Sequence, residues 1–220
     1  MHNRGPAGPW SEERHHHAPG DHQRRPAARH RREPAPYVAN KVADRLSGIH
    51  RDWLAHSPLG FVATTDAGGR IDVSPKGDPP GFVHVIDEVT IALPERPGNR
   101  RADGYLNVLQ QPGVGTLFVV PGRGDTLRIN GRATIVADAD YFDAMAVDGK
   151  RPILALEIDV AEVFFHCPKA FLRSDAWKPE TWDPTALPST AQIAQGIRKG
   201  ADLAELEDYY REDNQRKLLY

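Results

Sequence analysis

The stretch of residues 89–136 constrains the fold most, because strand-like and helix-like runs follow one another there in a clear order. Residues 114–120 are almost entirely apolar, and a Pro-Gly-Arg-Gly-Asp turn separates them from residues 126–136. In the second run apolar and polar side chains alternate, which indicates a strand with one buried face. Two strands joined by a tight turn predict a hairpin, so we expect an antiparallel sheet.

A short strand and a basic loop precede that hairpin. Residues 89–93 predict a strand that Pro94 should end. The turn-forming Pro97 and Gly98 follow, and a helix is expected at residues 103–111. Arginine forks and the free N–H groups at a helix start together suit a phosphate. The alternative is a solvated loop of ordinary surface arginines. The loop carries three of them, Arg96, Arg100 and Arg101.

Further elements flank this stretch. An amphipathic helix is predicted at residues 37–55, from apolar residues spaced three and four apart. Residues 59–65 and 70–74 predict a hairpin around an Asp-Ala-Gly-Gly turn. Further strands are expected at residues 82–86 and 153–165, and a short helix at residues 141–147. The predicted fold class is mainly β with flanking helices (α+β).

Composition excludes several classes of protein. A formal net charge of −2 gives no general affinity for nucleic acid. Cys167 is the single cysteine, so no intrachain disulfide can form. No apolar run approaches the ~20 residues of a membrane span, and the N-terminus lacks the apolar core of a signal peptide. We therefore expect a cytoplasmic protein with no membrane association.

Three parts are expected along the chain. Residues 1–36 hold seven arginines, six histidines and six prolines with almost no aliphatic residue, which predicts a disordered basic tail. Its three consecutive histidines lack further ligands, so we expect no metal site. Residues 37–178 should form the folded domain. Residues 179–220 form an extension that is rich in proline at first and helical later.

Three ordered motifs resemble those of the FMN-binding split barrels typified by pyridoxamine 5'-phosphate oxidase. They are Ser74-Pro75-Lys76-Gly77, the Asn99-Arg100-Arg101 loop, and Leu127-Arg128-Ile129-Asn130-Gly131. The resemblance covers residues 59–177. It implies an antiparallel six-stranded split β-barrel and a homodimer that binds flavin at the subunit interface.

The resemblance also implies which residues bind the cofactor. The candidates for the phosphate are Lys76, Arg96, Asn99, Arg100 and Arg101. Apolar walls for the ring are expected from Leu93, Pro94, Leu117 and Phe118. The partner subunit should contribute Lys169, Arg173 and Trp177. The remaining candidates are Ser74, Pro75, Asp103, Asn107, Thr126 and Arg128.

The predicted function is an FMN-dependent oxidoreductase acting on an unknown small substrate. The dinucleotide fingerprint is absent, because Gly122-Arg123-Gly124 belongs to a hairpin turn. Flavin supplies the chemistry itself, so no catalytic side chain is named. Thr126 stands where the typical oxidase has a glutamine, which leaves pyridoxamine phosphate oxidation in doubt. The alternatives are a non-catalytic carrier or sensor of FMN, or of the deazaflavin F420, and a protein whose basic tail contacts nucleic acid.

Overall fold

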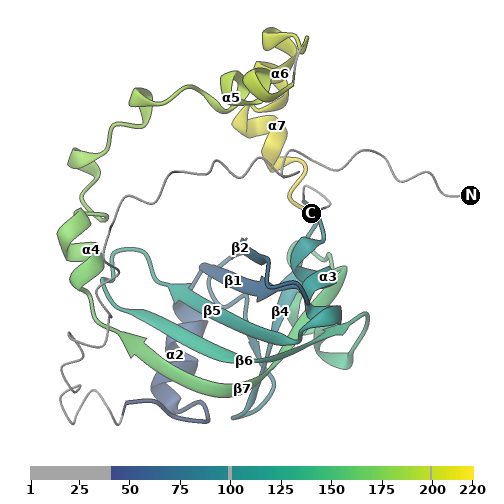
Figure 1. Cartoon of the computed structure of the whole chain (residues 1–220), viewed down its shortest axis with the longest axis vertical. Coiled ribbons are helices and arrows are strands. Elements are labelled where there is room, and N and C mark those ends of the chain that lie inside the picture. The colour runs from purple at the N-terminus through teal and green to yellow at the C-terminus, as the bar shows by residue number, and fades with distance from the viewer. Residues whose placement is uncertain (1–40, 99–100, 199) are drawn as a thin grey trace, which may run out of the picture.

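A single antiparallel sheet forms the centre of the computed structural model, which describes residues 41–98, 101–198 and 200–220 (Figure 1). The strand order is β2-β1-β5-β6-β7-β4-β3. The strands are β1 Leu59–Thr65, β2 Ile71–Gly77, β3 His84–Val85, β4 Thr90–Glu95, β5 Gly113–Val119, β6 Thr126–Val136 and β7 Leu154–His166.

The predicted fold class is confirmed, with seven strands instead of six. The additional strand is β3, a two-residue segment that pairs with β4. Among the described residues the sheet is not closed, because β2 pairs only with β1 and β3 pairs only with β4. The sheet curves like a barrel that is split between β2 and β4.

Two strands run further than the sequence predicts. β2 stays paired with β1 as far as Gly77, because an edge strand tolerates Pro75. Pro94 does not end β4, which pairs with β7 as far as Glu95. β3 pairs only with Ile91 and Ala92 of β4. The edge of β4 at Pro94 therefore has no neighbour on the β3 side, and the missing N–H of the proline breaks no hydrogen bond there.

The helices lie around the sheet and along the extension. Residues 37–40 of the helix expected at residues 37–55 lie outside the described residues. Within the described part the helix begins at Gly48, because Ala43 pairs with Val163 and the Leu46 N–H bonds to the Glu88 carbonyl. The helix expected at residues 103–111 is confirmed. The helices are α2 Gly48–His56, α3 Asp103–Gln110, α4 Lys169–Ser174, α5 Thr190–Ile197, α6 Leu203–Tyr209 and α7 Glu212–Arg216, with 3-10 turns η2 Asp140–Met145, η3 Pro179–Thr181 and η4 Pro184–Ala186.

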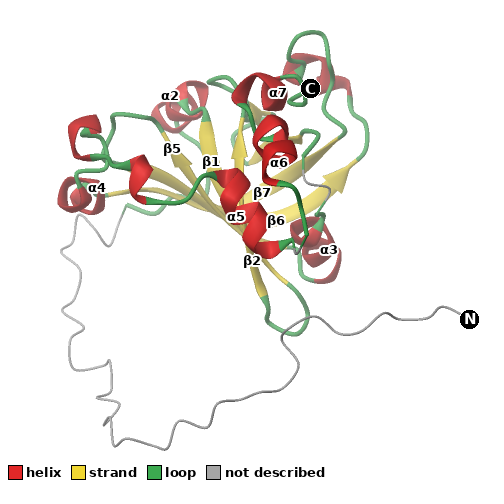
Figure 2. Cartoon of the chain, turned by 90° about the horizontal axis from the view of Figure 1, so that it is seen from above, coloured by secondary structure: helices red, strands yellow, loops and turns green. Residues whose placement is uncertain are grey.

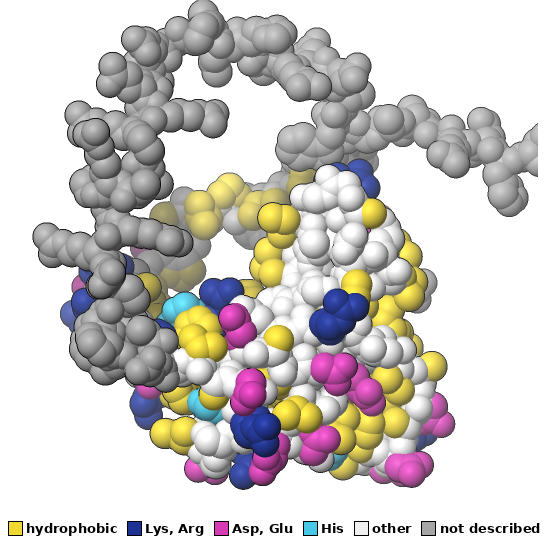
Figure 3. All heavy atoms as spheres, turned by 60° about the horizontal axis from the view of Figure 1, so that its bottom comes forward, with side chains coloured by type: hydrophobic (Ala, Val, Ile, Leu, Met, Phe, Trp, Pro, Cys, Tyr) yellow, Lys and Arg dark blue, Asp and Glu magenta, His cyan; other side chains and the backbone are white. Residues whose placement is uncertain are grey.

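The main core fills the concave side of the sheet. Leu54 of α2, Phe118 of β5 and Ile129 of β6 are fully buried within it. The alternation predicted for β6 is confirmed, since Leu127 and Ile129 are buried while Arg132 is exposed. On the face seen in Figure 3, acidic and basic side chains are interspersed with hydrophobic ones. No helix within the described ranges has the length and apolarity to cross a membrane.

In the extension after β7, α5 and α6 stand away from the sheet (Figure 1). α5 and α6 pack on each other through Ala191, Ala194 and Leu206. Figures 1 and 2 both show α4 and α3 at opposite ends of the sheet. Residues on α4 and on α3 of one chain therefore belong to different surfaces.

We expect Gly131→Ala to destabilise the fold by about 1–3 kcal/mol, because the new methyl group would overlap the Asp159 carbonyl at the irregular pairing between β6 and β7. Thermal or urea unfolding measures this loss. Gly113→Ala in β5 is the control, because its methyl group would meet no atom within 4 Å. Equal stability of the two variants would contradict the role of Gly131.

Candidate functional site

Side chains, instead of backbone hydrogen bonds, connect β2 to β4 across the split. Lys76 Nζ on β2 lies 2.5 Å from Glu95 Oε2 at the end of β4. One step beyond both strands, Arg96 Nε lies 2.6 Å from Asp78 Oδ2. The two ion pairs have opposite polarity, with the cation on β2 in the first and after β4 in the second.

The inward face of β2 is polar. Asp72, Ser74 and Lys76 alternate with Ile71 and Val73, and the polar set points into the split. The two apolar side chains point outward and are 76% and 60% exposed. A strand with this orientation leaves hydrogen-bonding groups inside and an apolar strip outside.

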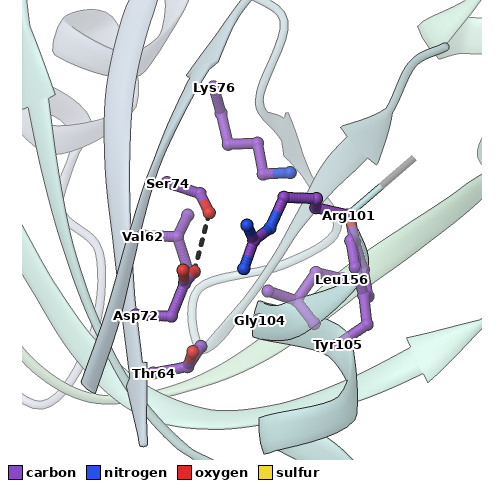
Figure 4. A pocket seen from close by; sticks show the side chains of 9 residues that line it. All are labelled: Val62, Thr64, Asp72, Ser74, Lys76, Arg101, Gly104, Tyr105 and Leu156. Carbon is purple, nitrogen blue, oxygen red and sulfur yellow. Dashed lines mark hydrogen bonds between the residues drawn. The ribbon is translucent and has the colours of Figure 1, made fainter. Parts of the chain in front are cut away.

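A small pocket lies between β2 and the start of α3 (Figure 4). Arg101 extends into it toward Asp72 and Ser74, whose hydroxyl donates to Asp72 Oδ2 over 2.7 Å. An adjoining cleft of about 430 Å³ continues to the end of β4. The pocket and the cleft share Asp72, Ser74, Lys76 and Arg101, and the cleft also contacts Pro75, Pro94, Arg96 and Asp103.

The cations of the pocket face carboxylates. Arg101 Nε lies 2.7 Å from Asp103, and this bond raises the arginine pKa, with a further contribution from Asp72. Glu95 also accepts a hydrogen bond of 2.6 Å from the Tyr105 hydroxyl. Burial and this ionised neighbour raise the pKa of Tyr105, which keeps the hydroxyl protonated. The lining holds its donors in place with nearly balanced charge.

Arg96 reaches the cleft but directs its donors into the protein. Besides Asp78, its guanidinium donates to the carbonyls of Met145, over 2.5 Å, and Lys150, over 3.3 Å. The ring of Tyr220 lies 5.6 Å from the guanidinium carbon. The side chain is only 12% exposed, so it anchors the start of the loop.

The other predicted cofactor residues on the sheet lie outside this pocket. Leu93 and Phe118 are buried in the core, so their side chains do not line the pocket or the cleft described above. Thr126 is also buried. Leu117 pairs with Arg128 on the convex face, and Arg128 lies over the Phe164 ring.

The remaining candidates divide between α3, α4 and the loop. Asn107 lies beside the pocket and donates a hydrogen bond of 3.0 Å to the Thr64 hydroxyl. Lys169 and Arg173 are exposed on α4, and the nearby Trp177 donates to the Arg123 carbonyl over 2.7 Å. This group lies at the far end of the sheet from α3 (Figure 1). Asn99 and Arg100 lie outside the described residues.

Sequence reasoning missed several residues that line the pocket. Asp72 could have been found, because it occupies the same face of an alternating strand as Ser74 and Lys76. Tyr105 lies within the predicted helix, but no local pattern indicates that its hydroxyl bonds to Glu95. Thr64 and Leu156 come from distant strands and carry no local signal.

We expect Asp78→Asn to lower the unfolding free energy by about 3 kcal/mol, because it leaves the buried Arg96 without its counter-charge. Asp143→Asn is the matched control. It removes an exposed pair with Arg151 and should cost less than about 1 kcal/mol. Chemical denaturation of both variants measures the difference, and equal losses would show that the Arg96 pair is not a special anchor.

Solved structures resemble the sheet domain at low identity. HupZ of Group A Streptococcus is 22% identical over 55% of this chain and 93% of that chain, with a TM-score of 0.44. An FMN-binding protein from Syntrophomonas wolfei is 15% identical over 54% of this chain and 89% of that chain, with a TM-score of 0.41. An F420 reductase is 17% identical over 55% of this chain and 98% of that chain, with a TM-score of 0.37. No curated protein matches the chain.

A family model gives the assignment. The model described as pyridoxamine 5'-phosphate oxidase matches residues 46–167, which is more than half of the 220 residues and includes all seven strands. The chain therefore belongs to the pyridoxamine 5'-phosphate oxidase family.

Proposed function

We propose that this protein binds FMN at the split between β2 and β4 and acts as a flavin-dependent oxidoreductase. The observation that supports this most is the polar inward face of β2, which lies opposite Arg101 at the edge of an open cleft. The family assignment points to the same cofactor class. The substrate stays open.

The donor set fits a phosphate monoester. Lys76 and Arg101 provide the charge, and the Ser74 hydroxyl lines the same pocket. α3 begins at Asp103, so its first N–H groups add partial positive charge at the same place. Lys76 and Arg101 each form an ion pair with a carboxylate in this structure. A bound phosphate would replace those carboxylates as the acceptor for donors that are already oriented toward the cleft.

The chain's own residues would mainly bind and orient the cofactor. Bound FMN would supply hydride or electron transfer. Lys76 and Arg101 would fix the phosphate end, while Tyr105 keeps its proton beside Glu95 and stays neutral. A cleft of about 430 Å³ lies within the range of small-molecule sites.

A second copy of the chain would complete the site. Ile71, Val73 and Phe61 expose apolar side chains on the convex face of β1 and β2, beside the cleft. Exposed strips of this kind are typical of association surfaces. We propose that they form the homodimer interface and that Lys169, Arg173 and Trp177 of the second copy reach the flavin.

A carrier or sensor of FMN, or of F420, is the alternative function. The absorbance spectrum of purified protein and the mass of the released ligand identify the cofactor. Reduction of the bound flavin by NAD(P)H under anaerobic conditions then supports the oxidoreductase. A flavin-loaded protein that is never reduced would support the carrier.

We expect Arg101→Ala to weaken FMN binding about tenfold to a hundredfold, because a charge-assisted hydrogen bond to phosphate contributes about 1.5–3 kcal/mol. Quenching of FMN fluorescence on titration measures this change. Arg132→Ala, at an exposed position on β6, is the control and should bind like the wild type. Unchanged affinity in Arg101→Ala would refute the phosphate assignment.

We expect Val73→Asp to separate the dimer, because a two-fold interface brings the new carboxylates close together at a cost of several kcal/mol. Light scattering after size-exclusion chromatography gives the mass. Val89→Asp, at an exposed position just before β4, should leave the mass unchanged. A monomeric wild-type protein would exclude the proposed interface.

A further inference from the structure

Tyr220 belongs to the extension, yet it contacts the barrel beside the ligand cleft. Its hydroxyl donates to Asp78 Oδ1 over 2.5 Å, and Lys150 Nζ donates to its carbonyl over 3.0 Å. The residue contacts Asp78 across 142 positions of sequence. This contact holds together two segments that are far apart in the sequence.

Tyr220 completes the anchor of the arginine loop. Asp78 uses one carboxylate oxygen for Arg96 and the other for the Tyr220 hydroxyl. The Tyr220 ring also covers the Arg96 guanidinium. As a result the Asp78 side chain is only 2% exposed, and water screens this ion pair weakly.

The loop that follows Arg96 carries Arg101 into the pocket. Its other end is fixed where α3 begins, at Asp103. Between these ends Pro97, Gly98 and Arg101 are exposed, and Arg101 pairs with Asp103 at the start of α3. Anchored residues therefore stand on both sides of Arg101, and Arg96 is the one that precedes it.

We infer that Tyr220 is a positioning residue for the ligand cleft, acting through Asp78 and Arg96 on the loop that carries Arg101. The inference rests on the proposed function for its effect on FMN, but its effect on the loop can be measured without a ligand. The hydrogen bond to Asp78 raises the pKa of Tyr220 to about 12, so the hydroxyl keeps its proton at neutral pH.

Limited trypsin digestion of the unliganded full-length protein tests the loop. We expect Tyr220→Phe to increase cleavage after Arg101 about tenfold, because it removes a hydrogen bond to a charged group. Tyr220→Ala, which also uncovers Arg96, should increase it further. Tyr209→Ala is the matched control, because that exposed tyrosine of α6 contacts Tyr210 and should leave cleavage unchanged.

FMN titration of the same variants tests the consequence for binding. The dissociation constant should rise in the order Tyr220→Phe, then Tyr220→Ala, with Tyr209→Ala equal to the wild type. Unchanged cleavage in both Tyr220 variants, or equal cleavage in the Tyr209 control, would overturn the inference. Faster cleavage with unchanged FMN affinity would also overturn it. If the wild type binds no FMN, the proposed function fails, and this positioning role fails with it even if the loop anchor holds.

Discussion

The split between β2 and β4 is the constraint on which the rest of the structure depends. A closed barrel would pair these strands through backbone groups, whereas here Lys76–Glu95 and Arg96–Asp78 pairs span the gap. Side chains keep the two strands in place and leave room between them. The opening admits Arg101 and the start of α3, so the cleft exists because the sheet stays incomplete.

Local patterns were sufficient to predict most of the sheet. The alternation in residues 126–136 and the turn before it gave β6 and its hairpin with β5. The helix predicted at residues 103–111 matches α3 to within one residue. The two prolines do not end their strands as the sequence predicts, because Pro75 and Pro94 each have a neighbouring strand on one side only. The pairing of residues 41–46 with distant segments also left no local signal, so α2 begins later than the apolar spacing suggests.

The site was predicted in part, and the division has a physical reason. Ser74, Lys76 and Arg101 lie together because a strand end and a loop meet across the split. Leu93 and Phe118 were expected to form walls, but apolar residues in the middle of a curved sheet fill its own core. The sequence did not predict Asp72, Glu95 and Tyr105 as site residues, because their contacts in the site join different elements of the fold. The anchoring of Arg96 by Tyr220 could not be seen in the sequence, since no local pattern joins positions so far apart.

The alternation in β2 makes this strand unusually sensitive to changes of length. Its even-numbered positions 72–76 face the small pocket, and its odd-numbered positions are the more exposed ones. Inserting or deleting one residue near its start would turn aspartate, serine and lysine outward and bring isoleucine and valine into the pocket. The proposed ligand binding and the proposed subunit association would then be lost in a single step, although the composition of the strand had hardly changed. Natural variation in β2 should therefore consist of substitutions, with changes of length confined to the Asp-Ala-Gly-Gly turn before it.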